Sequence, residues 1–349
     1  MFICEGPSRA LEFESPLPLI SVILPAFNGA HCIGLAIDSL LAQRLTDFEL
    51  IVVDDGSSDG TGKAATACGD PRVRVVTLPR NRGGNAARNA GIRAARAPLI
   101  AFLDSDDAYL PHKLEAIVAI FEARPELDVL VDSYRVTFPD GQPEEQRINL
   151  PVEGAAFVEA LYQRWLWKAT PAISARRDAV LRAGLFDEEL RRRQDFDFLA
   201  RAARVAHCAA TDQMLWVKSW SPGAISAQPE KFIPATIALC QRHPEYVSDP
   251  RFFRGLARDI ARQFSRQMRA GRWRDAVRDL ALLRREFGAA GTLRMLGLGW
   301  REANVRKRAR QAAKLARAAS LAGDVSPVDA SPGDASASPA ARNRGSARS

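Results

Sequence analysis

Short apolar runs alternate with helical patterns in the first third of the chain. Ile33, Ile37 and Leu40 share one helical face. Residues 85–97 form an Ala-rich helical stretch, and Pro111 suits the first turn of a further helix. Strands that are apolar on both faces and alternate with helices predict a largely parallel sheet covered by helices on both sides. The four predicted strands are residues 19–24, 48–53, 73–78 and 98–103.

Longer helical patterns dominate the second half of the chain. Residues 252–268 and 273–287 each carry apolar side chains at helical spacing, and we expect these two helices to pack as an antiparallel pair. A basic helix is predicted to continue to about residue 319. Further predicted elements are a strand at residues 129–137, an aromatic-rich amphipathic segment at 157–167 and a helix within 184–206.

These elements predict an α/β protein of Rossmann-like organisation, with a mostly parallel sheet flanked by helices and an α-helical C-terminal region. After residue 321, Ser, Ala, Pro, Gly and Asp dominate, which predicts disorder. The predicted organisation is a flexible leader at residues 1–17, an α/β domain at 18–226, a helical region at 227–320 and a disordered tail at 321–349.

The sequence predicts neither a membrane-spanning helix nor a signal peptide. No stretch approaches the roughly 18 apolar residues that cross a bilayer. Glu5, Glu12 and Glu14 precede the apolar run at residues 17–27, where a signal peptide would carry basic residues. The five cysteines are an odd number without paired spacing, so we expect free thiols. Both observations predict a cytoplasmic protein.

The formal net charge of +8 is concentrated near the C-terminus. A run rich in Arg and Lys follows Arg294, with Glu302 the only acidic residue close by. Such a run suits an anionic membrane surface or a nucleic acid, but it is more often simply a solvated helix face.

Two acidic clusters follow predicted strands. Asp104, Asp106 and Asp107 lie within four residues, and their charges repel one another unless a cation lies between them. Mg²⁺ or Mn²⁺ would relieve that repulsion. The alternative is that Asp106 or Asp107 caps the helix that begins near Pro111. Because capping needs one carboxylate, it leaves the other two unexplained.

The second cluster, Asp54 and Asp55, ends another strand of the same sheet. In parallel sheets, functional groups collect beyond the carboxyl ends of the strands, so the two clusters should lie at one edge. These carboxylates could accept hydrogen bonds from a nucleoside, or could serve a turn or a helix cap. The glycines of residues 82–85 open the helix that carries Arg88, an arrangement that favours phosphate. Dinucleotide-binding and P-loop patterns are absent, which excludes those two classes.

Four motifs in this order resemble the family 2 glycosyltransferases, a large inverting group that uses the GT-A fold and nucleotide-sugar donors. The similarity is close over residues 19–115 and looser to about 226. The motifs are SVILPAFN at residues 21–28, IVVDDGSSDGT at 51–61, NAARNAG at 85–91 and IAFLDSDD at 100–107 followed by Leu110-Pro111.

The resemblance implies a nucleotide-sugar-binding half at residues 18–135 and an acceptor half at 136–226. The residues implied to contact the nucleotide sugar are Pro25, Ala26, Phe27, Asn28, Asp54, Asp55, Gly84, Arg88, Ser105 and Asp106. The residues implied to hold the divalent metal are Asp104, Asp106 and Asp107.

The resemblance also implies that Asp195 is the catalytic base. A base on the face opposite the leaving group removes the acceptor proton, and single displacement inverts the sugar carbon. The alternative is a helix N-cap. Two positions depart from the family: Gln194 replaces the usual Glu and follows Arg191–Arg193, and Ser221 stands where a His is common.

The expected function is therefore sugar transfer to an acceptor hydroxyl in cell-surface polysaccharide or glycoconjugate synthesis. UDP- or dTDP-sugars are the favoured donors, and a glycan or lipid-linked molecule is the favoured acceptor. The basic C-terminal region suggests peripheral contact with the inner face of the cell membrane, and nucleic acid is disfavoured. One alternative, a sugar-nucleotide nucleotidyltransferase, would need a Gly-rich basic loop after the first strand, which is absent. The other is a non-catalytic module that binds nucleic acid or membrane through the basic region.

Overall fold

The computed structural model describes residues 17–139, 141–220 and 228–323, with side chains as far as Arg301. The leader, most of the predicted tail and Ser221 lie outside the described residues. The strands are β1 (Ile20–Ala26), β2 (Phe48–Asp54), β3 (Val73–Thr77), β4 (Leu99–Phe102), β5 (Ala108–Tyr109), β6 (Val129–Thr137), β7 (Glu145–Arg147), β8 (Val152–Glu153), β9 (Ile173–Arg176) and β10 (Cys208–Ser219).

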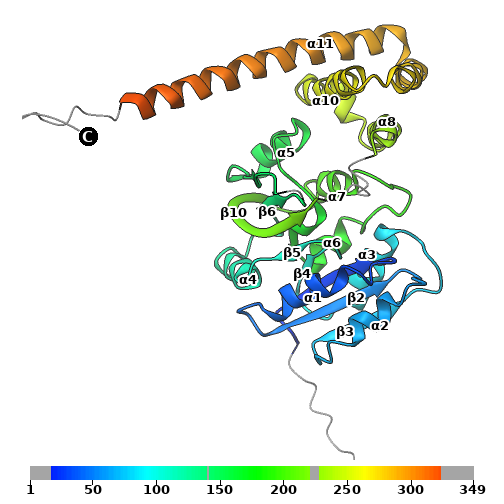
Figure 1. Ribbon diagram of the computed structural model, residues 1–349, viewed down its shortest axis with the longest axis vertical. Helices are drawn as coiled ribbons and strands as arrows, with labels where there is room; N and C mark the ends of the chain where they lie inside the picture. The colour runs from blue at the N-terminus through cyan, green and yellow to red at the C-terminus, as the bar shows by residue number, and fades with distance from the viewer. Residues whose placement is uncertain (1–16, 140, 221–227, 324–349) are drawn as a thin grey trace, which may run out of the picture. The chain divides into compact units, whose positions relative to one another are not determined.

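These strands form one mixed sheet in the order β3-β2-β1-β4-β9-β6-β10-β5, with β7 on β6 and β8 on β10 (Figure 1). The helices are α1 (Ile33–Leu41), α2 (Thr61–Thr66), α3 (Gly84–Ala94), α4 (Lys113–Ala123), α5 (Gly154–Tyr162), α6 (Arg177–Arg182), α7 (Gln194–Ala202), α8 (Phe232–Arg242), α9 (Glu245–Ser248), α10 (Pro250–Arg269) and α11 (Trp273–Gly323), with short 3-10 turns at Thr170–Ala172 and Pro229–Lys231.

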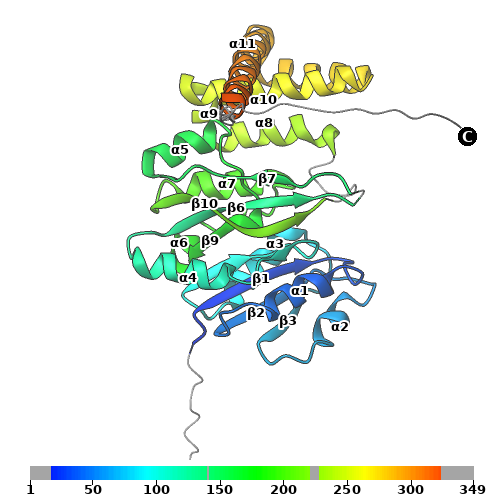
Figure 2. The same cartoon turned by 60° about the vertical axis from the view of Figure 1, so that its left-hand side comes forward.

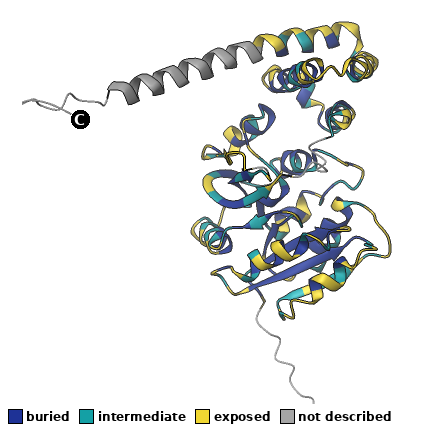
Figure 3. Ribbon diagram, viewed as in Figure 1, coloured by how far each residue is buried: buried dark blue, intermediate teal, exposed yellow. Residues whose placement is uncertain are grey.

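The first four strands are parallel to one another, as the sequence predicted, and β10 also pairs in parallel with β6. β1 pairs in parallel with both β2 and β4, and β3 pairs in parallel with β2. Every residue of β1 and β2 is buried (Figure 3). Right-handed crossovers then place α1 and α2 on one face and α3 on the other. Gly91 lets α3 approach closely, because a Cβ there would lie 2.5 Å from Ile23 of β1.

The rest of the sheet is mixed because β9 enters antiparallel between β4 and β6. Sequence reasoning missed β9 and β10. The polar stretch Thr211–Gln213 interrupts the apolar pattern of β10, at a point where its register against β6 shifts. The helix predicted within residues 184–206 is present as α7. α7 begins only at Gln194, because Leu185 and Arg193 both take positive φ angles of 64° and 66°.

The C-terminal helices gather on the side of the molecule remote from β2 and β3 (Figures 1 and 2). α10 matches its prediction, and α11 contacts it through a 2.7 Å hydrogen bond between Gln267 and Asp279. α11 contains a break at Gly288, whose φ of 69° and ψ of 172° are not helical. Within its first part Leu283 is buried, whereas Trp273, Val277 and Leu280 are exposed, so only part of the apolar side chains at helical spacing pack against the protein.

Residues 1–303 and 304–349 form two separate units, and α11 crosses the boundary between them. Cys32, Cys68, Cys208 and Cys240 are free thiols, as predicted, and Cys4 lies outside the described residues. In the part of the chain that the structure describes, every helix is too short or too polar to traverse a bilayer.

Candidate active site

Hydrogen bonds tie together the loops that follow β1 and β2. Asn28 takes a left-handed φ of 49°, a conformation that Asn tolerates better than most residues. Its backbone N–H donates to Ser57 Oγ at 2.9 Å, and its side-chain oxygen accepts from the N–H of Ser58 at 3.0 Å. Asp59 accepts from the N–H of Ala30 at 3.0 Å. Sequence reasoning missed the bracing role of Ser57, Ser58 and Asp59.

The other predicted nucleotide residues at the end of β1 differ in accessibility. Pro25 and Ala26 are buried in the strand, whereas Phe27 is 48% exposed and Asn28 is also exposed. Ser105, from the loop after β4, lies beside this segment, since its Oγ would be 3.5 Å from a Cβ at Gly29. The β1 and β4 loops therefore meet at the carboxyl edge of the sheet.

Asp54 and Asp55 face different loops. Both carboxylate oxygens of the buried Asp55 accept backbone N–H groups, from Arg82 at 2.8 Å and Gly83 at 2.7 Å. Asp55 therefore holds the glycine loop before α3. Asp54 accepts from the N–H of Ser57 at 3.0 Å, so the turn role that the sequence left open is present for this residue.

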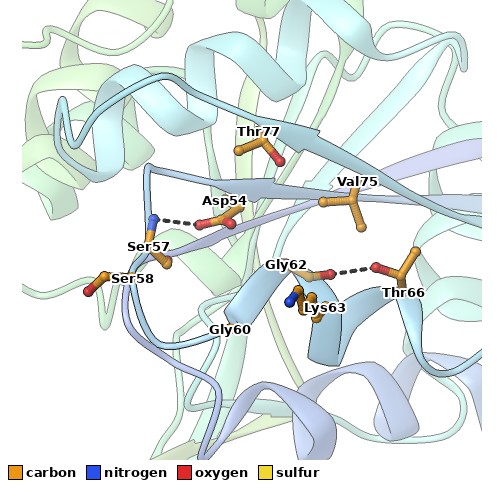
Figure 4. A pocket seen from close by; sticks show the side chains of 9 residues that line it. All are labelled: Asp54, Ser57, Ser58, Gly60, Gly62, Lys63, Thr66, Val75 and Thr77. Carbon is orange, nitrogen blue, oxygen red and sulfur yellow. Dashed lines mark hydrogen bonds between the residues drawn. The ribbon is translucent and has the colours of Figure 1, made fainter.

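A pocket of about 520 Å³ lies between α2 and the ends of β2 and β3 (Figure 4). Of the residues predicted to bind the nucleotide sugar, only Asp54 lines it. Its other lining residues are Ser57, Ser58, Gly60, Gly62, Lys63, Thr66, Val75 and Thr77. The pocket adjoins the β2 loop but does not reach the end of β1.

Arg88 connects α3 to the acidic cluster after β4. Its guanidinium is almost fully buried and donates to Asp104 Oδ1 at 2.6 Å and to Asn85 Oδ1 at 3.3 Å. A Cβ at Gly84 would lie 3.3 Å from the same guanidinium, so the glycine leaves room for it. Arg88 thus neutralises one of the three crowded acids.

The other two acids of the cluster have different surroundings. Asp107 is buried, and its Oδ1 accepts from the N–H of Ser219 at 3.0 Å, while Lys218 Nζ lies 3.6 Å from Oδ2. Burial raises the pKa of Asp107 well above its usual range, opposed by Lys218 and reinforced by Asp104. Asp106 is accessible to solvent, yet partial desolvation and the charge of Asp104 raise its pKa too.

Neither Asp106 nor Asp107 caps the following helix, so that alternative is wrong. α4 begins at Lys113, and its N-cap, His112, makes no side-chain capping bond. The three acids are not gathered into a ready metal cage either. Within the described ranges no group of three or more His, Cys, Asp or Glu side chains stands close enough to hold a metal ion. Asp104 is engaged by Arg88 and Asp107 by β10, which leaves Asp106 the most accessible of the three.

Two asparagines of α3 hold the loop that leads to Asp195. Asn89 exchanges two hydrogen bonds with the backbone of Phe186, at 2.8 and 2.9 Å. Asn85 donates to the carbonyls of Asp187 at 2.7 Å and Leu190 at 2.8 Å. From the sequence, these asparagines were known only as members of the NAARNAG motif. Their contacts could not be predicted, because the partner loop lies about a hundred positions further along the chain.

Asp195 lies in the first turn of α7. The N-cap is Arg193, with no side-chain capping bond, so the helix-cap alternative for Asp195 is wrong. Asp195 Oδ1 accepts from the N–H of Phe196 at 2.8 Å. Burial, together with the charges of Asp195 and Asp107 and against Lys218 and Arg147, raises the pKa of Tyr134 to about 12. Asp195 and the acidic cluster therefore both lie close enough to Tyr134 to affect its pKa.

Asp197, two residues further on, has a structural environment. It is buried and bonds His243 Nε2 at 2.9 Å and Arg201 at 2.7 Å. Burial opposes its charged form, but the bonds to His243 and Arg201 outweigh this and lower the pKa of Asp197. Asp195 instead lies near three cations, and its negative charge raises the pKa of each. They are Arg164, Lys168 and Arg192.

Comparison with known proteins agrees with this arrangement. Residues 21–184 match the family described as "Glycosyl transferase family 2". This segment, just under half of the chain, is similar to glycosyl transferase family 2. The match covers the four parallel strands β1 to β4 and the acidic loop after β4, and it ends just before the loop that leads to Asp195.

Several curated relatives share this domain. The succinoglycan biosynthesis protein ExoO of Rhizobium meliloti is 36% identical over 220 residues, covering 60% of this chain and 63% of the relative. The uncharacterized glycosyltransferase EpsJ of Bacillus subtilis is 33% identical, covering 62% and 65%. An Escherichia coli protein, the UDP-Glc:alpha-D-GlcNAc-diphosphoundecaprenol beta-1,3-glucosyltransferase WfgD, is 38% identical over 102 residues, covering 29% and 40%. The chain spans just under two thirds of the first two relatives.

Among solved structures, S. aureus TarS 1–349 in complex with UDP-GlcNAc has a similar fold. It aligns with a TM-score of 0.60 at 18% identity, covering 83% of this chain and 92% of TarS. The predicted GT-A fold class, with a sheet flanked by helices and a helical C-terminal region, is confirmed.

Proposed function

We propose that this protein is an inverting glycosyltransferase that moves a sugar from a nucleoside-diphosphate donor to an acceptor hydroxyl in cell-surface polysaccharide or glycoconjugate synthesis. The observation that carries the proposal is the double role of α3. Arg88 of α3 binds Asp104 of the acidic loop, and Asn85 and Asn89 bind the loop that leads to Asp195. One helix therefore positions both the donor-side acids and the base.

In this proposal Asp195 acts as the general base. An acceptor hydroxyl is a weak nucleophile until a carboxylate removes its proton during attack, and such help typically accelerates a reaction about 10²–10⁴-fold. The proton passes to an Asp195 carboxylate oxygen as the acceptor oxygen bonds to the sugar carbon and the nucleoside diphosphate leaves. A single displacement of this kind inverts the configuration at that carbon.

The acidic loop suits a divalent cation. Asp106 is accessible, and Asp107 Oδ2 is buried with no hydrogen-bond donor among the residues that the structure describes. Mg²⁺ prefers oxygen ligands and often takes only one or two protein carboxylates, with waters and phosphates completing its shell. We propose that Asp106 holds Mg²⁺ or Mn²⁺, with Asp104 or Asp107 assisting. When bound, the ion would stabilise negative charge on the leaving diphosphate.

We propose that the nucleoside lies against the loops that follow β1 and β2. Phe27 offers an exposed ring, and Asp55 holds the glycine loop that precedes α3. Backbone N–H groups at the start of that helix favour phosphate. UDP-sugars are our first choice of donor and dTDP-sugars the second, since the name of WfgD includes UDP-Glc and the TarS structure is a complex with UDP-GlcNAc.

We propose a lipid-linked or glycan acceptor at the inner face of the cell membrane, reached through α11. Trp273, Val277 and Leu280 follow at helical spacing and are exposed, and Arg272 and Arg274 beside them are exposed too. An amphipathic helix with apolar and basic side chains of this kind suits the surface of an anionic membrane. WfgD, by its name, acts on a diphosphoundecaprenol-linked sugar.

Vesicle binding tests the membrane contact. The double variant Trp273→Ser, Leu280→Ser should bind phosphatidylglycerol vesicles at least tenfold more weakly than the unchanged protein in a sedimentation assay. Leu35→Ser is the matched control, because Leu35 is an exposed leucine of α1. Equal losses in both variants would contradict a role for α11.

A nucleotide panel tests the donor assignment. UDP, dTDP and GDP are each added with Mn²⁺ or with EDTA, and the melting temperature is recorded, since a bound ligand stabilises the folded state by mass action. We expect UDP or dTDP with Mn²⁺ to give the largest increase. No shift with any nucleotide would sink the proposal. Pyrophosphate release from UTP and a sugar phosphate would instead show a nucleotidyltransferase.

A further inference from the structure

Arg193 is a buried arginine, with 6% of its side chain exposed. Among the residues that the structure describes, none accepts a hydrogen bond from its Nε, Nη1 or Nη2. Its nearest charged partner is Asp259, 3.9 Å away, and its guanidinium lies 4.5 Å from the ring centroid of Phe232. Buried donors without partners are costly, so a side chain in this state points to a missing anion.

Three cations share one buried carboxylate in this region. Arg164 approaches Asp259 at 3.0 Å, and its guanidinium and the Lys168 ammonium lie 6.0 and 5.3 Å from the Phe196 ring centroid. Burial and the charge of Arg164 lower the pKa of Lys168 to about 7 and that of Arg193 to about 10. Positive charge therefore exceeds negative charge here, and the excess destabilises the unliganded protein.

The cluster lies beside Asp195 and is separate from the acidic loop. The charges of Asp195 and Asp259 raise the pKa of Lys168. The charges of Asp107, Asp104 and Asp106 raise the pKa of Lys218. The two lysines therefore respond mainly to different carboxylates. Phe196, against which Arg164 and Lys168 pack, directly follows Asp195 in α7.

The cluster is reachable from the surface. The Arg164 side chain is 23% exposed and Lys168 is half-buried. Between them in the chain, Trp165 and Trp167 are 47% and 38% exposed. Aromatic rings present the flat apolar surface on which a sugar ring can pack, while arginine forks match phosphate oxygens.

We propose that Arg164, Lys168 and Arg193 form a site for a phosphate or diphosphate ester carried by the acceptor, next to the base Asp195. The inference rests on the proposed function, since it takes Asp195 to mark the acceptor side. A phosphate there supplies the acceptor oxygens that the Arg193 nitrogens lack and balances the excess positive charge. The same phosphate would hold the acceptor sugar so that its hydroxyl faces Asp195.

Calorimetric titration with inorganic pyrophosphate in EDTA tests the site directly, without turnover. We expect Arg193→Gln and Lys168→Gln each to weaken pyrophosphate binding about tenfold or more, the usual effect of losing one charge-assisted hydrogen bond. Arg251→Gln is the control, because Arg251 is exposed and already paired with Asp249 at 2.7 Å. We expect no change in that variant. Equal affinity in the Arg193, Lys168 and unchanged proteins would overturn the proposal.

A second titration separates acceptor phosphate from donor diphosphate. UDP binding in Mn²⁺ should be unchanged in Arg193→Gln, and a parallel loss of UDP affinity would overturn the acceptor assignment. If UDP binds none of the proteins while pyrophosphate binding still depends on Arg193, the phosphate site stands and the donor proposal fails. Farnesyl diphosphate then distinguishes the source: binding tighter than pyrophosphate indicates a lipid-borne ester, and equal binding indicates a phosphate on a soluble glycan.

Thermal unfolding distinguishes a loss of binding from a loss of folding in these variants. Arg193→Gln removes a buried, poorly paired charge, while Asp259 still forms its ion pair with Arg164. We therefore expect the variant to melt at the same temperature as the unchanged protein or above it, a pattern that is typical of residues kept for binding. A lower melting temperature together with unchanged pyrophosphate affinity would mark Arg193 as a structural residue.

Discussion

On the donor side of the candidate site, the charged groups are largely matched from within the protein. Asp55 accepts two backbone N–H groups, and Asp104 accepts the Arg88 guanidinium. On the acceptor side, no described residue accepts a hydrogen bond from the Arg193 guanidinium, and Asp259 faces several cations. The donor side is thus organised before any ligand arrives, whereas the acceptor side keeps a charge imbalance that a ligand would correct.

This difference separates two ways of building a site. Internal hydrogen bonds on the donor side position loops and also stabilise the fold, so mutations there should reduce stability and binding together. Unpaired cations on the acceptor side reduce stability in exchange for affinity, so mutations there should affect stability and binding in opposite directions. The following predictions test this comparison.

The largest expected effect is the loss of turnover in Asp195→Asn. We expect transfer to fall about 10²–10⁴-fold, because the amide cannot accept the proton. The melting temperature should stay within a few degrees. Asp178→Asn is the matched control, since Asp178 also lies in the first turn of a helix and is exposed. Rate assays with a UDP-sugar would measure this, and full turnover by Asp195→Asn would remove the assignment of the base.

Asp197→Asn provides the contrast two residues away. It breaks a buried pair with His243 and Arg201, and removing one partner of a buried pair typically costs about 3–5 kcal/mol. Urea unfolding should therefore show a large loss of stability. An unchanged unfolding midpoint would mean that Asp197 is not the structural acid described above.

Asp106→Asn should remove the metal-dependent part of UDP binding. We expect UDP affinity in Mn²⁺ to fall at least tenfold, to the level that EDTA gives in the unchanged protein, because the most accessible carboxylate of the loop is lost. Calorimetric titration of UDP with and without Mn²⁺ checks this. If Asp106→Asn kept the full increase in UDP affinity that Mn²⁺ gives, the ion would have to bind elsewhere.

Asp55→Ala should weaken stability and nucleotide binding together. It leaves the N–H groups of Arg82 and Gly83 without their acceptor, which we expect to cost about 1–3 kcal/mol. Asp47→Ala is the control, because Asp47 is exposed and substitutions at such sites usually stay within about 0.5 kcal/mol. Urea unfolding and UDP titration measure the two effects. A change in binding without a change in stability would contradict the bracing role.

The smallest expected effect is a pH dependence of pyrophosphate binding. Burial, Arg164 and Arg193 lower the pKa of Lys168 to about 7, against Asp195 and Asp259, which raise it. Since anion binding needs the ammonium form, affinity should be highest below about pH 7 and fall several-fold above it. The decline should be shallower in Lys168→Gln. An identical profile in that variant would exclude Lys168 as the titrating group.

The strands and motifs around the donor side could be predicted from sequence because their signals are local. β1 and β2 are continuous buried runs, and the acids Asp54, Asp55 and Asp104 follow strands directly. β10 could not be predicted, since the polar residues at its register shift break the pattern. The break at Gly288 was likewise invisible, because glycine alone does not show which conformation it takes.

The sequence alone determined the fold class, the acidic loops and the choice of Asp195, since each depends on neighbouring residues and on family motifs. Only the tertiary structure decided which charges meet. It turned Asp107 toward Ser219 of β10, placed Arg88 against Asp104, and brought Arg164, Lys168 and Arg193 around Asp259. The physical reason is that electrostatic and hydrogen-bond energies depend on distance in space, which sequence separation does not give.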